Sequence, residues 1–210
     1  MESESLDGLG KKTEEDNHME AWKTLARTPA FQGGNGRFLM VEHHTVQLPD
    51  GRIIEEWPWV ITPDYVNVVA VTAEGEFLCF RQTKYAIDGV ALAIVGGYLE
   101  PGEDPLLAGQ RELLEETGYQ ATKWTLLGHF AVDGNRGCGT AHLYLARNAT
   151  WVQPIHADDL EEQTLVRLTR QEVTTALHQG EFKVLPWSTA IALALLALDG
   201  LVRREPTDSP

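Results

Sequence analysis

Three glutamates within five consecutive positions are the residues of this 210-residue sequence best suited to metal chemistry. They are Glu112, Glu115 and Glu116, in the run Arg-Glu-Leu-Leu-Glu-Glu. At about 100° per residue, a helix places Glu115 and Glu116 within roughly 60° on either side of Glu112. Like charges at this spacing destabilise a helix. The cluster is therefore either a solvated acidic surface or a divalent-cation site, since Mg²⁺ and Mn²⁺ prefer hard oxygen ligands.

The flanking residues predict the helix that holds these glutamates. Asp104 suits an N-cap, Pro105 the first helical position, and Gly118 a left-handed C-terminal cap. Four leucines fall on the opposite half of the helix and predict its packing face: Leu106, Leu107, Leu113 and Leu114. Ala108 and Gly109 lie beneath the carboxylates and add little bulk there.

The glutamates belong to a longer pattern, Gly-x5-Glu-x7-Arg-Glu-U-x-Glu-Glu-x-Gly-U, in which U is a bulky apolar residue. The sequence matches every fixed position: Gly97, Glu103, Arg111, Glu112, Glu115, Glu116 and Gly118. Tyr119 stands where an aliphatic residue is more usual. The pattern is the signature of the Nudix hydrolases, and the sequence resembles that family. Its fixed spacing is far more specific than a lone glycine motif.

The resemblance implies a role for each motif residue. Four groups would hold Mg²⁺ or Mn²⁺ while water attacks a diphosphate: the carboxylates of Glu112, Glu115 and Glu116 and the carbonyl of Gly96. Arg111 and Glu103 would form an ion pair that fixes the loop over the helix. Gly97 and Gly118 would be glycines because of the backbone geometry at those positions.

The general base is left open among three glutamates. Enzymes that this chain resembles often use a glutamate on a loop before a late strand, and here that loop reads HADDLEEQTLVRL. Glu161 is the first choice and Glu162 the second, although a solvated acidic loop explains either residue equally well. In the alternative version Glu115 itself activates the water.

The order of elements predicts an α+β fold. Strands are expected at 37–48, 52–61, 65–72, 76–82, 90–95, 123–131, 140–146 and 162–168, and later helices at 170–179 and 186–199. Strands first, with helices inserted and at the end, favour a mixed sheet. The resemblance implies the Nudix α/β/α sandwich with an N-terminal β-hairpin extension.

Over residues 20–200 the layout resembles the ADP-ribose pyrophosphatase-like branch, whose members imply a homodimer. The expected domain plan has four parts: 1–18, an acidic tail expected to be disordered; 19–62, a β extension that forms the dimer; 63–200, the hydrolase domain; and 201–210, a polar tail. A small-molecule nucleotide diphosphate is the expected partner.

Five residues are candidates for substrate contact, each with a plainer alternative. Trp57 and Trp59 would stack on a nucleobase across the dimer, or form dimer core. Arg81 and Lys84 would contact phosphate, or mark an exposed strand end. Arg136 would contact phosphate, or belong to a flexible surface loop.

Two departures from the branch leave the substrate open. Where its members usually read Glu-x-Pro-Ala-Gly, this chain has Ala93-Ile94-Val95-Gly96-Gly97, and the loop at 132–139 lacks the usual Ser-Pro-Gly. ADP-ribose is the first candidate substrate, and other nucleotide sugars come next. The alternatives are a dinucleoside polyphosphate, an oxidised nucleotide, or a Nudix module that senses a nucleotide without cleaving it.

Charge and composition narrow the class of protein. A formal charge of −14, from 17 basic and 31 acidic residues, argues against broad binding to nucleic acid or anionic membranes. The chain has two cysteines, which favours a reducing compartment, and a cytoplasmic location is expected. No signal peptide is recognisable, and the longest apolar run, 190–198, is too short to span a bilayer.

Overall fold

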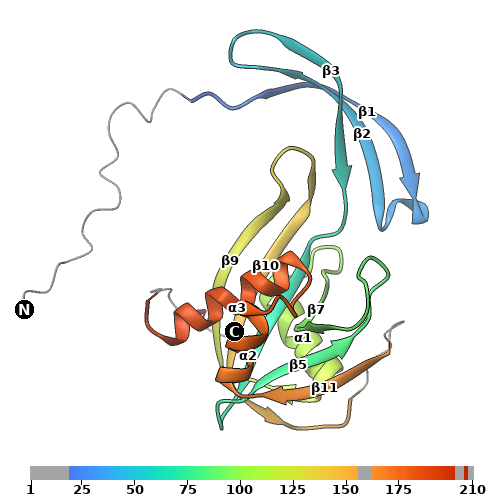
Figure 1. Cartoon of the computed structure of the whole chain (residues 1–210). Coiled ribbons are helices and arrows are strands. Elements are labelled where there is room, and N and C mark those ends of the chain that lie inside the picture. The colour runs from blue at the N-terminus through green and yellow to red at the C-terminus, as the bar shows by residue number, and fades with distance from the viewer. Residues whose placement is uncertain (1–18, 156–161, 202–205, 208–210) are drawn as a thin grey trace, which may run out of the picture. The chain divides into compact units, whose positions relative to one another are not determined.

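The computed structural model describes residues 19–155, 162–201 and 206–207 (Figure 1). The chain divides between Val60 and Ile61 into two compact units. Three strands make up the described part of the first unit: β1 (Lys23–Gly33), β2 (Leu39–Gln47) and β3 (Ile53–Ile61). A 3₁₀ turn, η2 (Gly34–Gly36), joins β1 to β2.

The first unit is a three-stranded sheet in the order β1-β2-β3. The expected β2–β3 hairpin closes through a hydrogen bond from Leu48 N to Arg52 O at 2.8 Å. The strand β1, antiparallel to β2, was not predicted. Nearly all of β1 is exposed, and Val46 and His44 are the buried residues among those described in this unit.

The second unit contains the remaining strands and all three α-helices of the described chain. Its strands are β4 (Tyr65–Thr72), β5 (Phe77–Gln82), β6 (Ala91–Ala93), β7 (Val95–Tyr98), β8 (Tyr119–Gln120), β9 (Lys123–Asp133), β10 (Gly137–Trp151), β11 (Gln163–Leu168) and β12 (Pro206–Thr207). Its helices are α1 (Pro105–Thr117), α2 (Arg170–His178) and α3 (Leu185–Leu198). The predicted elements are present, except that the single strand expected at 90–95 is two strands, β6 and β7, and β7 continues through Gly96 and Gly97. The expected polar tail contributes β12, which pairs with β9.

The sheet of the second unit is mixed, as expected. Its central order is β10-β4-β5-β11, in which β10 and β4 run parallel and the other two pairs run antiparallel. Strand β7 pairs with β4, β6 with β5, and β9 with β10. The loop before α1 is therefore attached directly to the middle of the sheet, through β7.

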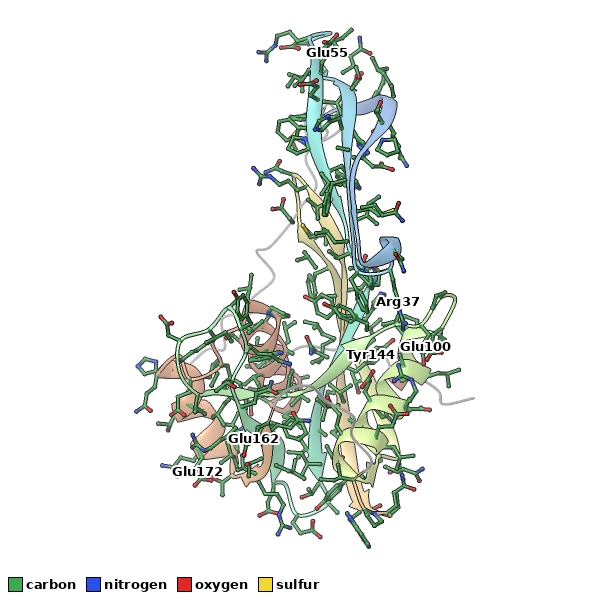
Figure 2. The ribbon with its side chains drawn as sticks, turned by 90° about the vertical axis from the view of Figure 1, so that its right-hand side faces the viewer. Arg37, Glu55, Glu100, Tyr144, Glu162 and Glu172 are labelled. Atoms are coloured by element: carbon green, nitrogen blue, oxygen red, sulfur yellow. The ribbon has the colours of Figure 1, made fainter. Side chains whose placement is uncertain are left out.

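Helices cover both faces of this sheet, so the expected α/β/α sandwich is confirmed (Figure 2). Helix α1 packs on the face that carries Val66 and Val68, while α2 and α3 pack on the other. The largest fully buried side chains come mainly from the sheet: Phe77, Leu78, Leu92, Leu127, Leu143, Leu145, Val66, Val68, Val69 and Val95. No helix in the described part of the chain is long and apolar enough to cross a membrane.

The local signals fix the two ends of α1. The Asp104 carboxylate accepts from Leu106 N at 2.9 Å and from Leu107 N at 3.1 Å, so two otherwise unpaired helical amides are satisfied. Gly118 has a φ of 73° and ends the helix by donating to Leu114 O at 2.8 Å. The predicted bounds of the helix agree with the structure.

The predicted packing face of α1 was partly wrong. Leu106 and Leu113 are buried, but Leu107 is 46% exposed and Leu114 only half-buried, whereas Gly109 is buried. A Cβ on Gly109 would lie 3.3 Å from methyl carbons of Val66 and Val68. The helix therefore approaches the sheet along its small-residue side, which turns Glu112 and Glu116 toward β7 and turns Leu107 and Leu114 away from the sheet.

Candidate active site

Arg111 connects four parts of the motif. Its Nε donates to Glu103 Oε1 at 2.9 Å and its Nη2 to Glu103 Oε2 at 3.0 Å, a two-point ion pair between helix and loop. Its Nη1 donates to Glu112 at 2.8 Å and to Glu115 at 3.1 Å. The Nη2 group also reaches the Tyr98 carbonyl in β7, at 3.4 Å. The guanidinium thus fixes the loop before α1 relative to two of the three glutamates.

The ion pair perturbs both partners. The hydrogen bonds from Arg111 hold the pKa of Glu103 below its ordinary value of 4.5. Glu103 in turn is the main cause that raises the pKa of Arg111, and Glu112 and Glu115 add to it. Each partner therefore keeps its charge more firmly in the folded protein than it would alone.

Glu116 is the most buried of the three glutamates, with 9% of its surface exposed. Its Oε2 accepts a hydrogen bond from the Gly96 amide at 3.1 Å. The Gly96 peptide and Glu116 are thus held together, although 20 residues separate them in sequence.

The two motif glycines have steric reasons to be glycine. A Cβ on Gly97 would overlap Oε1 of Glu112 and lie 2.7 Å from its Oε2. A Cβ on Gly118 would overlap the Gln153 carbonyl oxygen, and the φ of 73° there disfavours other residues. Gly97 thus leaves room for the Glu112 carboxylate beside β7.

The donor set suits a hard divalent cation, because it consists of carboxylates and a backbone carbonyl. In the part of the chain that the structure describes, however, no three His, Cys, Asp or Glu side chains converge closely enough to hold a metal ion. Glu112 and Glu115 instead form ion pairs with Arg111. A cation bound by Glu112, Glu115, Glu116 and the Gly96 carbonyl would take the place of that guanidinium as the partner of two carboxylates.

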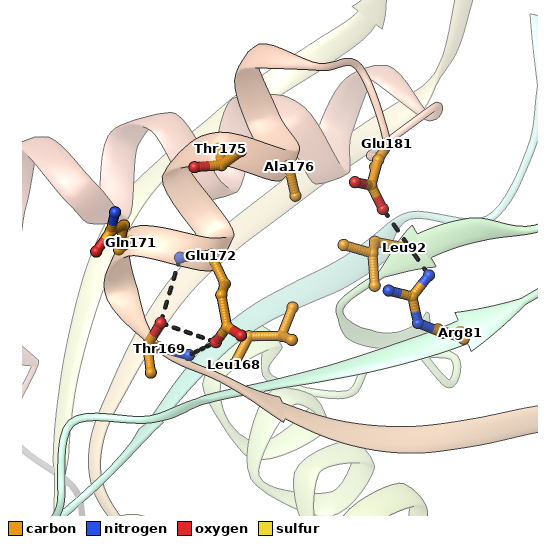
Figure 3. Close-up of a pocket in the computed structure, with 9 residues that line it drawn as sticks. All are labelled: Arg81, Leu92, Leu168, Thr169, Gln171, Glu172, Thr175, Ala176 and Glu181. Atoms are coloured by element: carbon orange, nitrogen blue, oxygen red, sulfur yellow. Dashed lines mark hydrogen bonds and ion pairs between the residues drawn. The ribbon is translucent and has the colours of Figure 1, made fainter.

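Arg81 lies on the other face of the sheet from these glutamates. It pairs with Leu92 and Thr164 in neighbouring strands and lines a cavity of about 470 Å³ beneath α2 (Figure 3). Its Nη1 lies 3.8 Å from Glu181 Oε2. The structure does not bring Arg81 together with the glutamates, and its contact with substrate phosphate stays a prediction.

The other two candidate cations occupy loops of the same unit. Lys84 is half-buried just after β5, where its carbonyl accepts from Ile87 N at 2.9 Å. Arg136 is exposed in the β9–β10 loop, and its Nη1 lies 3.5 Å from Asp133 Oδ2. Their proposed contacts with phosphate are untested.

Both candidate tryptophans lie in β3 and are held by aromatic side chains of their own unit. The Trp57 ring packs edge-on to Trp22 at 5.2 Å, and Trp59 stacks on His44 at 5.3 Å. All four rings belong to the first unit. Nucleobase stacking by Trp57 or Trp59 stays a prediction.

The candidate bases occupy different environments. Glu162 is exposed just before β11 (Figure 2), whereas Glu161 lies outside the described residues. Glu115 is hydrogen-bonded to Arg111. One residue that the sequence analysis passed over, Asn67, lies beside Gly96; its signal was a lone amide within a run of β-branched residues.

Comparison with known proteins settles the family. The NUDIX domain family model matches residues 62–188, which is more than half of the chain. This chain belongs to the Nudix family. The match covers strands β4 to β11 and helices α1 and α2 of the second unit, and the predicted family is confirmed.

Relatives of this Nudix hydrolase cover most of its length. ADP-ribose pyrophosphatase of Bacillus subtilis (strain 168) is 30% identical, over 84% of this chain and 92% of its own. Methanol dehydrogenase activator of Bacillus methanolicus is 29% identical, over 87% of this chain and 96% of its own. A solved structure called "Crystal structure of ADP compounds hydrolase" superposes with a TM-score of 0.73, at 18% identity, over 87% of this chain and 97% of that one. The likeness supports the Nudix fold and the ADP-ribose pyrophosphatase-like branch.

Proposed function

We propose that this Nudix hydrolase cleaves the pyrophosphate bond of a nucleoside diphosphate linked to a sugar, with ADP-ribose as the leading candidate. The observation that carries the proposal is the complete glutamate set on α1, with Glu116 bound to the Gly96 amide and Glu112 seated over Gly97. A module that only sensed nucleotides would not need all three carboxylates. Similarity to a protein named ADP-ribose pyrophosphatase supports the choice of substrate.

The proposed reaction is hydrolysis of a P–O–P linkage. Water oxygen forms a bond to one phosphorus, the bridging P–O bond breaks, and two monophosphates leave. Bound Mg²⁺ or Mn²⁺ would neutralise phosphate charge and lower the pKa of water. Glu112, Glu115, Glu116 and the Gly96 carbonyl would hold that cation, while Glu161, Glu162 or Glu115 takes the proton from water.

Phosphate groups would need cations to approach an acidic chain. Lys84 and Arg136 lie on loops, where side chains can turn toward a ligand, so they are proposed as phosphate contacts. Arg81 is a weaker candidate because its strand directs it to the face that carries α2. We therefore rank Lys84 above Arg81 as a candidate for contact with substrate phosphate.

We also propose a homodimer formed through the first unit. Its sheet exposes Leu25 at 52%, Phe31 at 57% and Ile53 at 56%, and few of its described residues are buried. An isolated three-stranded sheet with so little core has little to stabilise it, and a second copy would cover these apolar side chains. Trp57 and Trp59 of one copy would then stack on the nucleobase bound by the other copy, or belong to the core of the dimer.

We also propose a cytoplasmic location for this protein. Its two cysteines favour a reducing compartment.

The test is a substrate screen with coupled phosphate release. The chain with Mg²⁺ is given ADP-ribose, several nucleotide sugars, dinucleoside polyphosphates and nucleoside triphosphates, with a phosphatase that acts only on products. Preference for ADP-ribose or another nucleotide sugar supports the proposal. Turnover of triphosphates or dinucleoside polyphosphates alone would overturn the substrate class, and binding without turnover would favour a sensor.

The screen should include a CMP-linked substrate. A relative from Streptomyces rubellomurinus (strain ATCC 31215), 28% identical over 82% of each chain, is named CMP-5'-(N-acetyl-N-hydroxy-3-aminopropyl)phosphonate hydrolase. The names of these relatives thus refer to different nucleotides. Preference for the cytidine compound over ADP-ribose would replace the leading candidate.

A further inference from the structure

Asn67 is a buried amide in the middle of the sheet. It belongs to β4, whose sequence YVNVVAVT is otherwise mainly apolar, and only 5% of its surface is exposed. Its neighbours across the strands are Leu143 of β10 and Gly96 of β7. Valine or another apolar residue would suit such a position better. The amide therefore needs an explanation other than packing.

The hydrogen bonds of Asn67 do not explain its burial. Its Nδ2 donates to the Val95 carbonyl at 3.5 Å, which is a long hydrogen bond, and its buried Oδ1 has no partner among the residues that the structure describes. A buried polar atom without a partner destabilises a fold. Retaining this amide therefore lowers stability, as functional groups often do.

The Asn67 side chain is packed directly against Gly96. A Cβ on Gly96 would overlap Asn67 Nδ2 and lie 2.5 Å from the Val66 carbonyl. Asn67 thus touches the residue whose amide donates to Glu116, at 3.1 Å. In the proposed function the carbonyl of Gly96 is also a cation ligand.

The two contacts reach β7 from opposite sides of the sheet. Val66 and Val68 face α1, which carries Glu116, so Asn67, between them in β4, faces the other way. Glu116 holds the Gly96 peptide from one side, while Asn67 covers Gly96 and binds the preceding carbonyl from the other. Together they restrict rotation of the Val95–Gly96 peptide.

We propose that Asn67 is a positioning residue for the cation site, which fixes the Val95–Gly96 backbone so that Gly96 presents its carbonyl to the metal and its amide to Glu116. The inference rests on the proposed function, because it assigns Asn67 a purpose only if Gly96 is a ligand. It predicts that Asn67 contributes to metal affinity and not to the stability of the fold.

The test compares Mn²⁺ binding with stability in the full chain. Asn67→Val replaces the amide by the residue type common in β4, and Asn67→Ala removes it without adding bulk. Electron paramagnetic resonance of free Mn²⁺ gives the dissociation constant, and urea unfolding gives stability. We expect both variants to bind Mn²⁺ about tenfold more weakly, as groups that orient metal ligands typically do. Asn67→Val should unfold at the same or a higher urea concentration.

Thr72→Val is the matched control. Thr72 is equally buried at the far end of β4, and its hydroxyl accepts from Glu76 N at 3.2 Å, away from Gly96. It should leave Mn²⁺ binding unchanged. An unchanged dissociation constant in both Asn67 variants, with Mn²⁺ binding lost in Glu112→Gln and Glu116→Gln, would overturn this inference and leave the proposed metal site intact. If neither glutamate variant changes Mn²⁺ binding, the proposed function fails and this inference falls with it.

Discussion

Gly97 and Glu112 occupy adjoining space, so that a Cβ on Gly97 would overlap one carboxylate oxygen of Glu112 and lie 2.7 Å from the other. Gly97→Ala should therefore push Glu112 from its place. Because misplacing a catalytic group by about 1 Å can lower the rate 10²-fold, we expect kcat to fall by about that factor. Overpacking should also lower the free energy of unfolding by about 1–3 kcal/mol.

Gly134→Ala controls for the loss of a glycine, since a Cβ added at Gly134 would have no atom within 4 Å. It should leave both kcat and unfolding unchanged. Steady-state kinetics and urea unfolding measure the two effects. Normal turnover by Gly97→Ala would show that Glu112 has no required position beside β7.

The Arg111–Glu103 ion pair gives stability that depends on pH. Because the folded pKa of Glu103 lies below 4.5, its contribution is present above about pH 4.5 and is lost as pH falls through the folded pKa. Glu103→Gln should therefore lower the free energy of unfolding by about 1–2 kcal/mol near neutral pH. The difference from the parent should shrink below about pH 4.5.

Urea unfolding of parent and Glu103→Gln at several pH values measures this difference. Glu172→Gln serves as a comparison, because the Glu172 carboxylate also has a lowered pKa but owes it to hydrogen bonds from Thr169 at the N-cap of α2 and not to an ion pair with arginine. It should change stability without changing kcat, whereas Glu103→Gln should reduce kcat as the loop loosens. An equal stability difference at all pH values would contradict the ion-pair account.

Three single substitutions distinguish the candidate general bases. Glu161→Gln should lower kcat by about 10²–10⁴-fold if Glu161 takes the proton from water, since that is what a positioned base contributes. Glu162→Gln, on an exposed residue just before β11, should lose less than about tenfold. The pH dependence of kcat in each variant checks the assignment. A far larger loss in Glu162→Gln or Glu115→Gln would move the base to that residue.

The proposed dimer and the two tryptophans are tested together. Light scattering should give twice the chain mass of 23.3 kDa. Trp57→Ala should raise KM about tenfold with no change in mass if its ring stacks on the nucleobase, because such stacking is worth about 1–3 kcal/mol. A monomeric parent would remove the argument for a tryptophan supplied by a partner chain. A monomeric variant from a dimeric parent would assign Trp57 to the dimer core.

The sequence alone determined the family, the bounds of α1 and the mixed sheet. Those features rest on local physics: Asp104 satisfies amides two and three residues ahead of it, Gly118 adopts a left-handed cap, and a run of β-branched residues marks the strand β4. Each depends on neighbours within a few residues, which the sequence displays directly.

Only the tertiary structure decided how the elements face one another. Leu107 was predicted to pack but is exposed, because Gly109 allows α1 to approach Val66 and Val68 along a different side. The same long-range pairing sends Arg81 to the face opposite the glutamates and sets Asn67 against Gly96, 29 positions later in the chain. Sheet register brings together residues that are distant in sequence. A one-residue shift in register would turn every side chain of a strand to the other face of the sheet. No local sequence pattern therefore specifies these contacts.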